Sequence, residues 1–428
     1  MAGTRSDAPP LRGDLDVEIA VIGAGYTGLS SALELRADGR EVAVLEAEYA
    51  GFGASGRNAG HLTPTIGKDV PTLVRVFGHR RARALLSLAE TAIRHVEEGI
   101  ARHGIACDYA PAGNVVAAVH DRQYAAVDRA ARAAAELGAH GTLLDEREMR
   151  RRALPAAFTR GFLEPLGGIL DPGRYVRGLR DATLRAGAAL FEHTPVVRVE
   201  RGSPLLLHTP AGRVRARRVV LATNAYTPRL GFLTSTILPL WVQLFRTAPL
   251  GAAQRAAIGW TGAEGIYTAH EMLESYRLTA DGRIVGGAKY VRYGYGGRAL
   301  ADADPGVALR LEEIFRRRFP ALDDVAITDH WGGPIAFALD FLPAVGRTGP
   351  DDSVLYAAGY AGHGVALATY AGKMIADLLA GRAGPGAALW ARRRIPLPPE
   401  PLRWLVVHGL TTIFGTIDRR VDRSVATA

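Results

Sequence analysis

The chain is poor in cysteine and has no long apolar runs. Cys107 is the only cysteine among 428 residues, which excludes an internal disulfide framework and any metal or iron–sulfur site that needs several thiolates. No stretch is long enough to span a bilayer, and residues 1–14 contain no apolar core of the kind that a signal peptide needs. We therefore expect a soluble, cytoplasmic protein with a disordered leader at residues 1–14.

Lysine is nearly absent as well, so the formal net charge of +9 comes from arginine. The arginine clusters at 80–83, 150–152 and 392–394 alternate with alanine and leucine, without the aromatic residues that accompany arginine in many nucleic-acid sites. This pattern indicates solvated helix surfaces and argues against a nucleic-acid partner. The most apolar segment near the C-terminus, Leu402–Ile417, is predicted to be a helix docked on the body. A weak interfacial membrane contact is the alternative.

Residues 17–28, VEIAVIGAGYTG, combine an apolar strand, a glycine-rich turn and the start of a helix. Gly23 permits the sharp turn, Gly25 lets the backbone approach a pyrophosphate, and Gly28 lets the helix pack closely on the sheet. Glu46 ends the next strand about 20 residues later, where an acid binds ribose hydroxyls. The pattern predicts an adenine dinucleotide, either NAD or FAD.

A second glycine-rich turn, GYAGHG at 359–364, follows a short apolar strand at 354–358 and opens a helix at 365–379. Each helix N-terminus offers N–H donors to electron-rich atoms. Two such termini suit a long cofactor with two polar ends, and FAD fits this better than NAD. The first helix would face the pyrophosphate and the second the pyrimidine edge of the flavin.

Between the two turns, residues 229–328 contain alternating strand-like runs and one helix at 305–319, which predicts an antiparallel sheet. We expect an α/β fold with a Rossmann-type FAD-binding lobe built on a parallel sheet, and an inserted α+β substrate lobe. The predicted boundaries are an FAD-binding domain at 15–108, 166–228 and 329–385, a substrate-binding domain at 109–165 and 229–328, and a C-terminal extension with an apolar helix at 386–428.

Five motifs carry a resemblance to a known family. They are VIGAGYTG with Glu46, GASGRNAGH at 53–61, VVLATNAYT at 219–227, HWGGPIAFALDFLPAVG at 330–346 and YAAGYAGHGVALATYAGKMIADLL at 356–379. With these motifs, residues 15–385 resemble the D-amino-acid-oxidase superfamily of FAD-dependent amine and amino-acid oxidoreductases, which includes glycine and sarcosine oxidases. The forms SGRNAG and TNAY are most similar to the γ-glutamylputrescine oxidase branch. The resemblance implies a GR2-like FAD-binding lobe.

The resemblance also implies the cofactor contacts. The first motif and Glu46 would hold the pyrophosphate and ribose, Val197 would meet the adenine through its backbone, and the later glycines would border the isoalloxazine. Arg57 would contact the ring or only balance phosphate charge. The implied FAD-binding residues are Gly23, Ala24, Gly25, Tyr26, Thr27, Gly28, Glu46, Ala47, Ser55, Gly56, Arg57, Asn58, Ala59, Gly60, Val197, Ala222, Thr223, Gly332, Gly333, Gly359, Tyr360, Gly362, His363, Gly364 and Val365. Cys107 lies outside the segments in which relatives tether flavin, so FAD is expected to be non-covalent, with a bond to His61 as the alternative.

Departures from the family pattern narrow the substrate. Relatives that bind small α-amino acids through the carboxylate carry an arginine or a lysine at positions where this chain has residues 334–336, Pro-Ile-Ala, and Ala366. A buried carboxylate without a cation is costly. The resemblance therefore favours an amine or a larger polar molecule.

Flavin-dependent amine oxidation requires mainly that a neutral amine is oriented over the ring and desolvated. Lys289 would promote the reaction of reduced flavin with oxygen, and His363 would tune the flavin or serve as a buried hydrogen-bonded histidine. The expected catalytic residues are His61, Tyr226, Lys289 and His363. The expected substrate-pocket residues are His61, Tyr267, Tyr276, His330 and Trp331, with Gln243 as a further candidate. No metal is expected.

We thus predict an FAD-dependent amine oxidase that transfers a hydride to flavin N5, with molecular oxygen as acceptor and an imine product that hydrolyses. One alternative is a membrane-associated or quinone-linked dehydrogenase, in which Leu402–Ile417 would touch the membrane. Two others are a tailoring oxidase of secondary metabolism and a flavin-carrying subunit of a larger complex.

Overall fold

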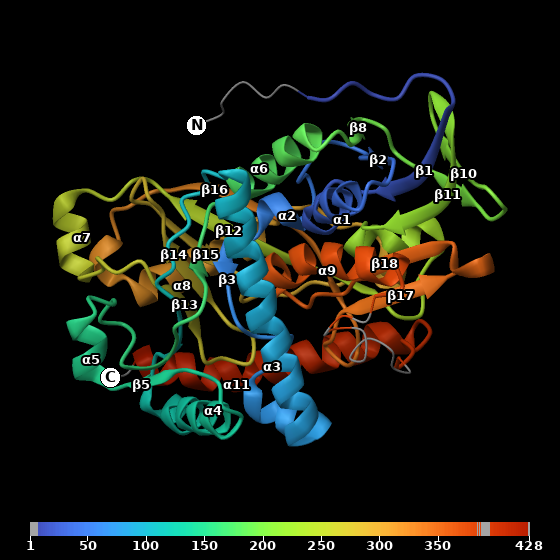
Figure 1. The fold of residues 1–428 in the computed structure, drawn as a ribbon. Coiled ribbons are helices and arrows are strands. Elements are labelled where there is room, and N and C mark those ends of the chain that lie inside the picture. Colours follow the sequence, from blue (N-terminus) through green and yellow to red (C-terminus); the bar gives the residue numbers. More distant parts are fainter. Residues whose placement is uncertain (1–6, 383, 385, 387–393, 427–428) are drawn as a thin grey trace.

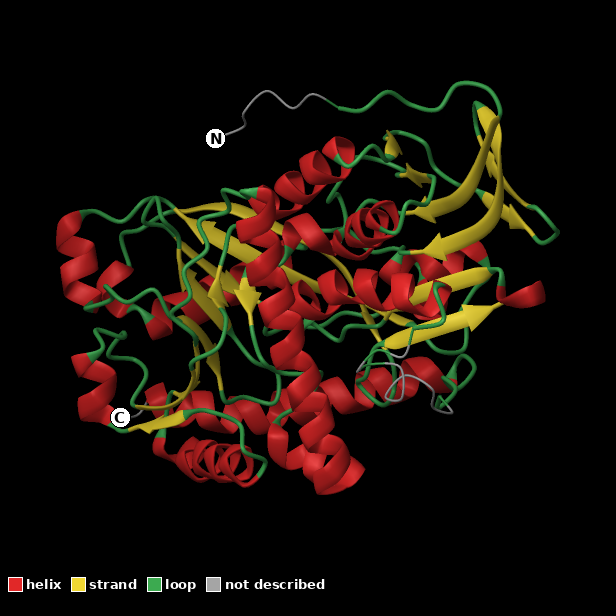
Figure 2. Cartoon of the chain, in the orientation of Figure 1, coloured by secondary structure: helices red, strands yellow, loops and turns green. Residues whose placement is uncertain are grey.

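In the computed structural model, residues 7–382, 384, 386 and 394–426 are described, and two large sheets organise them (Figures 1 and 2). The first sheet has the strand order β17-β18-β11-β1-β2-β8, and the hairpin strands β10 and β9 extend from β11. Strands β8, β2, β1, β11 and β18 run parallel to one another, as predicted for a Rossmann-type lobe, whereas β17 and β10 are antiparallel to β18 and β11. The bounds are β1 Leu15–Ile22, β2 Val42–Leu45, β8 Ala189–Phe191, β9 Arg198–Glu200, β10 Leu205–Thr209, β11 Gly212–Leu221, β17 Ala344–Thr348 and β18 Val354–Ala358.

Apolar residues cover both faces of this sheet, which is typical of parallel strands that are packed on both sides. Helices pack on one face, and the β9–β10 hairpin and the short helix η2 on the other. Helices α1 and α9 cross closely because Gly372 lacks a side chain: a Cβ there would lie 2.5 Å from Ser30. The elements are α1 Tyr26–Ala37, α2 Ala54–Arg57, α3 Val70–His103, α6 Pro172–Arg185, η2 Asn224–Leu230 and α9 Gly364–Leu379.

The second sheet has the order β16-β12-β15-β14-β13-β4-β6-β5. All neighbours are antiparallel except β13 and β4, so the predicted antiparallel sheet is confirmed. A small sheet of β3 and β7 lies apart from it. The strands are β3 His61–Leu62, β4 Asn114–Ala118, β5 Thr142–Leu144, β6 Arg160–Glu164, β7 Gly168–Ile169, β12 Leu238–Thr247, β13 Gly265–Thr268, β14 Ser275–Leu278, β15 Ile284–Gly287 and β16 Ile327–Phe337.

One face of the second sheet packs on an aromatic core beneath α8 (Pro305–Arg318). We call this the outer face. The other face carries Trp331 and Arg277, which donate hydrogen bonds to the backbone of residues 57 and 59 in the first lobe. We call this the inner face. The remaining helices are η1 Asp121–Gln123, α4 Tyr124–Glu136, α5 Glu146–Arg151, α7 Ala252–Ile258, η3 Tyr295–Gly297, η4 Pro320–Leu322 and η5 Pro350–Asp352.

The predicted lobe boundary at residue 329 is wrong. Strand β16 was assigned to the FAD-binding lobe, but it pairs with β12 from Leu238 to Thr247 and therefore belongs to the second sheet. Its apolar and glycine pattern is compatible with either lobe. Only the strand partner distinguishes them, and a strand partner is a long-range property.

The predicted disorder of the leader is also wrong where it can be examined, at residues 7–14. The N–H of Ala8 donates to Glu192 at 2.5 Å, and the N–H of Leu11 donates to Thr194 at 2.9 Å. The Leu11 side chain is buried. These partners lie far along the chain, so the local sequence could not reveal them. Residues 1–6 lie outside the described part.

The C-terminal extension forms α11 (Leu402–Ala426), which runs along the lower edge of Figure 1. Near its end, Asp418 accepts hydrogen bonds from the N–H groups of Glu271 and Met272 at 2.9 and 3.0 Å, so the helix is docked on the second lobe as predicted. Earlier turns expose apolar side chains, including Leu405 and Ile413. No helix among the described residues has both the length and the apolar character needed to cross a bilayer.

Candidate functional site

The first glycine-rich turn joins the carboxyl end of β1 to α1 and is shaped by close backbone contacts. Gly23 has φ of 103°, and a Cβ there would lie 2.9 Å from the carbonyl oxygen of Ala222. A Cβ on Gly28 would lie 1.8 Å from the carbonyl oxygen of Gly23. Both positions therefore require glycine. The resulting turn fits the pyrophosphate cradle predicted from the sequence.

Two side chains line the start of α1. The N–H of Tyr26 donates to the Oγ of Ser55 at 2.9 Å, and the N–H of Ala24 donates to the carboxylate of Glu46 at 2.7 Å. Burial raises the pKa of Glu46, while backbone N–H donors, including those of Ala24 and Ala47, oppose that rise. The acid predicted to bind ribose thus lies at the turn itself.

The second glycine-rich turn lies beside the first. The hydroxyl groups of Thr27 on α1 and Tyr360 are 2.7 Å apart and buried. The N–H of Gly359 donates to Asn224 at 3.1 Å, at the carboxyl end of β11. Both turns therefore meet at the carboxyl ends of parallel strands, where open α/β sheets bind ligands.

The segment that ends in α2 connects this edge to the second lobe. The side-chain amide of Asn58 donates to the hydroxyl of Tyr26 at 3.1 Å. The guanidinium of Arg57 lies 4.3 Å from the Phe52 ring centre, donates to the carbonyl oxygen of Gly332 at 3.0 Å, and forms an ion pair with Asp302. Arg57 therefore links the segment of residues 53–60 to β16.

The structure brings most of the predicted cofactor residues to this edge. The predicted residues in this region are Gly23–Gly28, Glu46, Ala47, Ser55–Gly60, Ala222, Thr223, Gly332, Gly333, Gly359, Tyr360 and Gly362–Val365. Tyr226 lies beside them, since a Cβ on Gly53 would be 3.6 Å from its ring. His363 lies at the start of α9, donates from Nδ1 to the carbonyl oxygen of Ala361 at 3.1 Å, and has a pKa lowered by burial.

Val197 directly precedes β9 and is exposed. Its N–H donates to the carbonyl oxygen of His208 at 2.9 Å, within the hairpin, and its side chain is 62% exposed. The N–H is therefore used within the hairpin, and the contact of the Val197 backbone with adenine stays a prediction.

Four polar residues meet where the inner face of the second sheet approaches His61. The Nδ1 of His61 is 2.9 Å from the Oδ1 of Asn114, and the ring of His61 lies edge-on to that of Tyr267, with centres 6.3 Å apart. The hydroxyl of Tyr267 donates to the carboxylate of Glu164. Gly265 makes room for this arrangement, because a Cβ there would lie 2.4 Å from His61 Nδ1. We call His61, Asn114, Glu164 and Tyr267 the inner-face cluster.

Asn114, Glu164 and the nearby Arg277 were missed by the sequence analysis. Each of these polar residues interrupts or ends an otherwise apolar strand, and this interruption was the signal in the sequence that could have identified them. Burial raises the pKa of Glu164 to about 7 and lowers the pKa of His61 to about 4. Buried polar groups of this kind concentrate at functional sites.

Three predicted pocket residues lie on the outer face, so the structure contradicts their assignment. Tyr276 is buried in the aromatic core and donates to Glu274 at 3.0 Å. His330 lies 3.0 Å from Glu312 of α8, and Gln243 exchanges hydrogen bonds with the backbone of Asp304. Alternation along a strand turns these side chains away from residues 53–60, whereas Trp331, one residue after His330, donates to the carbonyl oxygen of Arg57 at 2.9 Å.

Lys289 is also misassigned. Its ammonium lies 3.0 Å from Glu274, 3.5 Å from Asp422 and 3.9 Å from Asp418. Arg318 pairs with Glu274 and Asp422 in the same buried cluster. Lys289 therefore stabilises the docking of α11 and is not directed at a flavin.

His270, Glu274 and Asp422 lie close enough together to suggest a metal site. The two carboxylates already neutralise the buried cations Lys289 and Arg318. The ion pairs account for this cluster without a metal.

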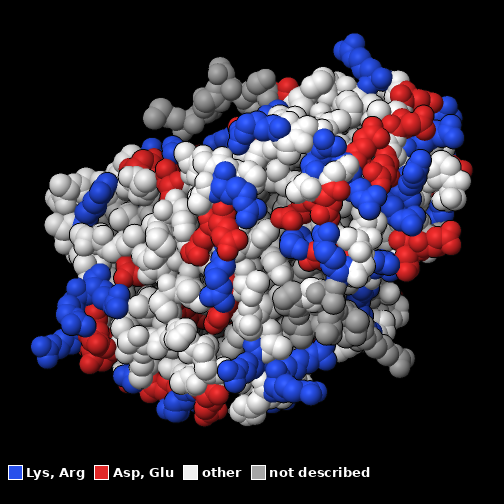
Figure 3. Space-filling model, viewed as in Figure 1, with Lys and Arg blue, Asp and Glu red and all other residues white. Residues whose placement is uncertain are grey.

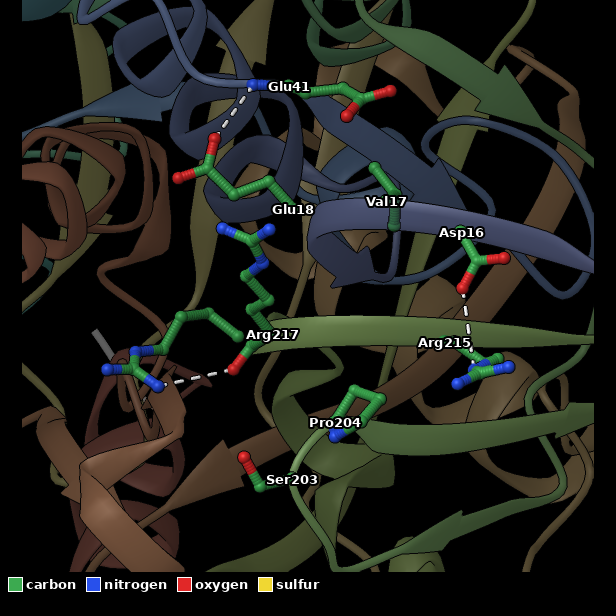
Figure 4. A pocket seen from close by; sticks show the side chains of 9 residues that line it. Asp16, Val17, Glu18, Glu41, Ser203, Pro204, Arg215 and Arg217 are labelled. Carbon is green, nitrogen blue, oxygen red and sulfur yellow. Dashed lines mark hydrogen bonds and ion pairs between the residues drawn. The ribbon is translucent and has the colours of Figure 1, made fainter.

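A groove at the opposite end of the first sheet is lined by exposed charges (Figure 4). Asp16 pairs with Arg215 at 3.4 Å, and the N–H of Glu41 donates to Glu18 at 3.3 Å. The groove lies at the amino end of β1, away from the edge where such sheets bind ligands. On the face shown in Figure 3, basic and acidic side chains are intermixed, which is typical of a solvated surface.

Comparisons with known proteins show the family of the chain and its fold. A family model described as FAD dependent oxidoreductase matches residues 18–378. The chain is 34% identical over 380 residues to γ-glutamylputrescine oxidoreductase of Escherichia coli (strain K12), covering 87% of this chain and 86% of that protein. It is 29% identical over 202 residues to glycine oxidase of Bacillus subtilis (strain 168), covering 45% of this chain and 49% of that protein. The solved structure of glycine oxidase from Geobacillus kaustophilus aligns with a TM-score of 0.75 at 21% identity, over 89% of this chain and 100% of that one, and confirms the predicted fold class.

Proposed function

We propose that the protein oxidises the CH–NH bond at the end of a larger polar amine. The chain belongs to the family of FAD-dependent oxidoreductases, and two of its relatives are named as a γ-glutamylputrescine oxidoreductase and a glycine oxidase. The observation that carries this proposal is the meeting of two glycine-rich turns and the inner-face cluster around one site. The turns suit a long dinucleotide, and the cluster suits an amine.

The residues of the first turn, with Glu46 and Ser55, would hold the pyrophosphate and ribose of FAD. The second turn and the start of α9 would face the flavin. FAD, when bound, accepts a hydride from the carbon next to the amine nitrogen. The oxidised substrate is an imine, which water hydrolyses.

The inner-face cluster, Trp331 and Tyr226 would surround the amine, with His61 and Tyr267 nearest to it. His363 would adjust the flavin environment from the N-terminus of α9. Holding the amine in one orientation and excluding water are the principal contributions of such side chains to the rate.

The substrate proposal rests on what the site lacks at two positions and on one relative. Ala336 and Ala366 are buried and apolar at positions where a carboxylate-binding cation was considered. The E. coli relative is named a γ-glutamylputrescine oxidoreductase. We propose a substrate of that kind, with a terminal amine on a long polar chain.

We further propose that FAD is held non-covalently, that oxygen is the acceptor and that the protein is cytoplasmic. Cys107 is buried, and burial raises the pKa of its thiol to about 11, so it is a poor nucleophile for flavin. Acid precipitation tests the first point, because free FAD then stays in the supernatant. A yellow pellet would indicate a covalent bond, with His61 as the candidate.

The decisive experiment mixes the purified yellow protein with primary amines, secondary amines, polyamines and γ-glutamylputrescine in the absence of oxygen. Bleaching of the flavin by a terminal amine supports the proposal. Stoichiometric peroxide on admission of air identifies an oxidase. Flavin that no amine reduces would instead support a flavin-carrying subunit.

A quinone-linked enzyme at a membrane surface is the second candidate, and the outer side of α11 favours it. Leu402, Leu405, Leu410 and Ile413 are 46–56% exposed there. Flavin that is reduced by amine, reoxidises slowly in air and passes electrons to a quinone would favour this reading. Flotation with anionic vesicles, lost on Leu405→Ser and Ile413→Ser, would show the membrane contact.

A further inference from the structure

The orientation of Asn114 determines which nitrogen of His61 carries the proton. The side-chain amide of Asn114 donates to the carbonyl oxygen of Leu62 at 2.8 Å and faces that of Gly168 at 3.4 Å. Its Oδ1 is therefore directed at His61 and can only accept. It follows that Nδ1 of His61 carries the hydrogen and that Nε2 has a lone pair.

The Nε2 of His61 has no hydrogen-bond partner among the described residues, although it is shielded from water. Burial lowers the pKa of His61 to about 4, and the nearby Arg277 acts in the same direction. The ring therefore stays neutral at physiological pH. Its Nε2 is a hydrogen-bond acceptor that lacks a donor.

Tyr267 is held in the same way. Its hydroxyl hydrogen is directed at the carboxylate of Glu164, so the remaining lone pairs of its oxygen can only accept. Glu164 and Asn114 are buried, and the side chains of His61 and Tyr267 are the more exposed members of the cluster. The cluster thus has two acceptor atoms without donors on its two less buried side chains and keeps its donors inside.

No cation among the described residues balances Glu164. Its pKa is raised by burial to about 7 and is lowered only by the hydrogen bond from Tyr267. The groups that face it are Tyr267 of β13 and Asn114 of β4, with His61 beyond Asn114. A buried carboxylate with no counter-ion is costly unless a ligand supplies the positive charge.

We propose that Asn114 and Glu164 are positioning residues that hold His61 Nε2 and Tyr267 Oη as a pair of acceptors for the ammonium group of the substrate. This inference rests on the proposed amine oxidation and deepens it. The ammonium donates one N–H to each acceptor. It then gives one proton to Tyr267 Oη as the Tyr267 proton passes to Glu164, which leaves a neutral amine and a protonated carboxyl group.

The direction of the pH dependence follows from Glu164. Above pH 7 the carboxylate accepts from Tyr267, and the acceptor pair is complete. Below pH 7 the protonated carboxyl group donates to Tyr267, whose own hydrogen then turns outward and opposes an ammonium ion. Amine binding and reduction should therefore weaken as the pH falls through about 7.

The test uses the FAD-loaded protein with Glu164→Gln. The new amide cannot take up the proton, and its NH₂ group donates to Tyr267. We expect kcat/KM for the best amine to fall about 10- to 100-fold, because a hydrogen bond to a charged group is lost, and the pH step near 7 to disappear. Tyr267→Phe should give a similar loss, and the double variant should be no worse than either single variant, since the two residues act as a unit.

A binding measurement separates recognition from turnover. The tert-butylammonium ion has no hydrogen on the carbon next to nitrogen and cannot be oxidised. Calorimetry should show that the wild-type protein binds it more weakly below pH 7, and that Glu164→Gln binds it weakly at every pH. The matched control is Glu97→Gln, which alters another carboxylate that accepts from a tyrosine, Tyr109, outside the cluster.

The outcomes are distinguishable. If the wild-type protein oxidises amines but Glu164→Gln and Tyr267→Phe keep its pH profile and its affinity for tert-butylammonium, the inference is overturned and the proposed function stands. If none of the amines reduces the flavin of the wild-type protein, the proposed function fails and the inference fails with it. If Glu164→Gln does not fold, Tyr267→Phe decides, because it retains the buried carboxylate.

Discussion

Single residues on the inner face of the second sheet have little freedom. His61, Asn114 and Tyr267 meet above Gly265, the one residue there whose lack of a side chain allows the contact. Through its hydrogen bonds, each side chain determines where the hydrogen atom of its neighbour lies. Asn114, which has no acid–base role of its own, therefore determines which nitrogen of His61 can accept a hydrogen bond.

Gly265→Ala is predicted to break this arrangement. Its Cβ would lie 2.2 Å from Asn114 Oδ1 and 2.4 Å from His61 Nδ1, closer than real atoms approach. We expect amine turnover to fall at least about tenfold, since displacement of a positioned group by about 1 Å has effects of this size. FAD content should not change, because both glycine-rich turns are untouched. Steady-state rates and bound flavin per chain provide the measurement.

Gly99→Ala in α3 is the control, because no atom lies within 4 Å of the added Cβ. It should preserve activity and raise the free energy of unfolding by about 0.5–1 kcal/mol, the helical advantage of alanine over glycine. Equal turnover by the two variants would contradict the proposed importance of the His61–Asn114 contact.

Among the elements, α1 and α9 matter most for the proposed FAD site. A pair of buried hydroxyl groups links their N-terminal ends, one from Thr27 on α1 and one from Tyr360 just before α9. Tyr360→Phe removes the 2.7 Å contact with Thr27 and leaves a buried hydroxyl without its partner. We expect the Kd for FAD to rise about 5- to 10-fold, corresponding to about 1 kcal/mol. Titration of the apoprotein with FAD measures this change.

Tyr175→Phe is matched to it, since Tyr175 is buried in the same core but contacts Thr369 at the longer distance of 3.4 Å. A smaller change in FAD affinity is expected there. If both variants bound FAD equally well, the Thr27–Tyr360 contact would have no special role in joining the turns.

The elements were largely predictable from the sequence, whereas the faces of the second sheet were not. Apolar periodicity and glycine turns marked β1, α1, β18 and α9 because those signals are local. Tyr267 and Tyr276 lie on adjacent strands with similar patterns, yet one faces inward and the other outward. A shift of one residue in register reverses every side chain of a strand, and register depends on partners elsewhere in the chain.

Lys289 illustrates the same limit. Strand β15 ends at Gly287, and Ala288 adopts φ of 77°, which redirects the chain just before the lysine. The resemblance to the family placed Lys289 beside the flavin, because the corresponding strand of relatives approaches the ring. The backbone turn instead carries it to α11, whose aspartates lie more than a hundred residues later in the sequence.

At the scale of the whole molecule, the ion pairs of Lys289 and Arg318 with Glu274 and Asp422 hold the last helix on the second lobe. Lys289→Met is predicted to lower the free energy of unfolding by about 3–5 kcal/mol, because it removes one of the two cations that neutralise this buried cluster and leaves its carboxylates with Arg318 alone. Reoxidation of the reduced flavin by oxygen should be unchanged. Chemical denaturation and stopped-flow reoxidation measure the two effects.

Lys373→Met is the comparison, since Lys373 forms a partly exposed pair with Asp377 along one helix. Such pairs contribute about 0.3–0.5 kcal/mol. Slower reoxidation in Lys289→Met alone would restore a direct role of that lysine in the reaction with oxygen.

Acid should weaken the same attachment. The neighbouring cations lower the pKa of Glu274 from its ordinary value of 4.5 to about 2, despite burial, and also lower that of Asp422. Carboxyl groups with depressed pKa values stabilise the folded state above their ordinary pKa, and this contribution is lost as the pH falls from about 4.5 towards 2. Unfolding curves at a series of pH values should show this slope, and Lys289→Met should flatten it.

Helix α11 follows in the sequence every strand of the lobe on which it docks, and this order has a consequence for synthesis. Before α11 has been made, Glu274 is the carboxylate that Lys289 and Arg318 share, so one of the two positive charges in the interior of the second lobe is not balanced. Asp418 and Asp422 supply negative charge only after the turns of α11 that contain them have left the ribosome. The second lobe is therefore completed late in synthesis, and chains released before Asp418 are expected to be captured by chaperones or proteases rather than to accumulate as a shortened enzyme.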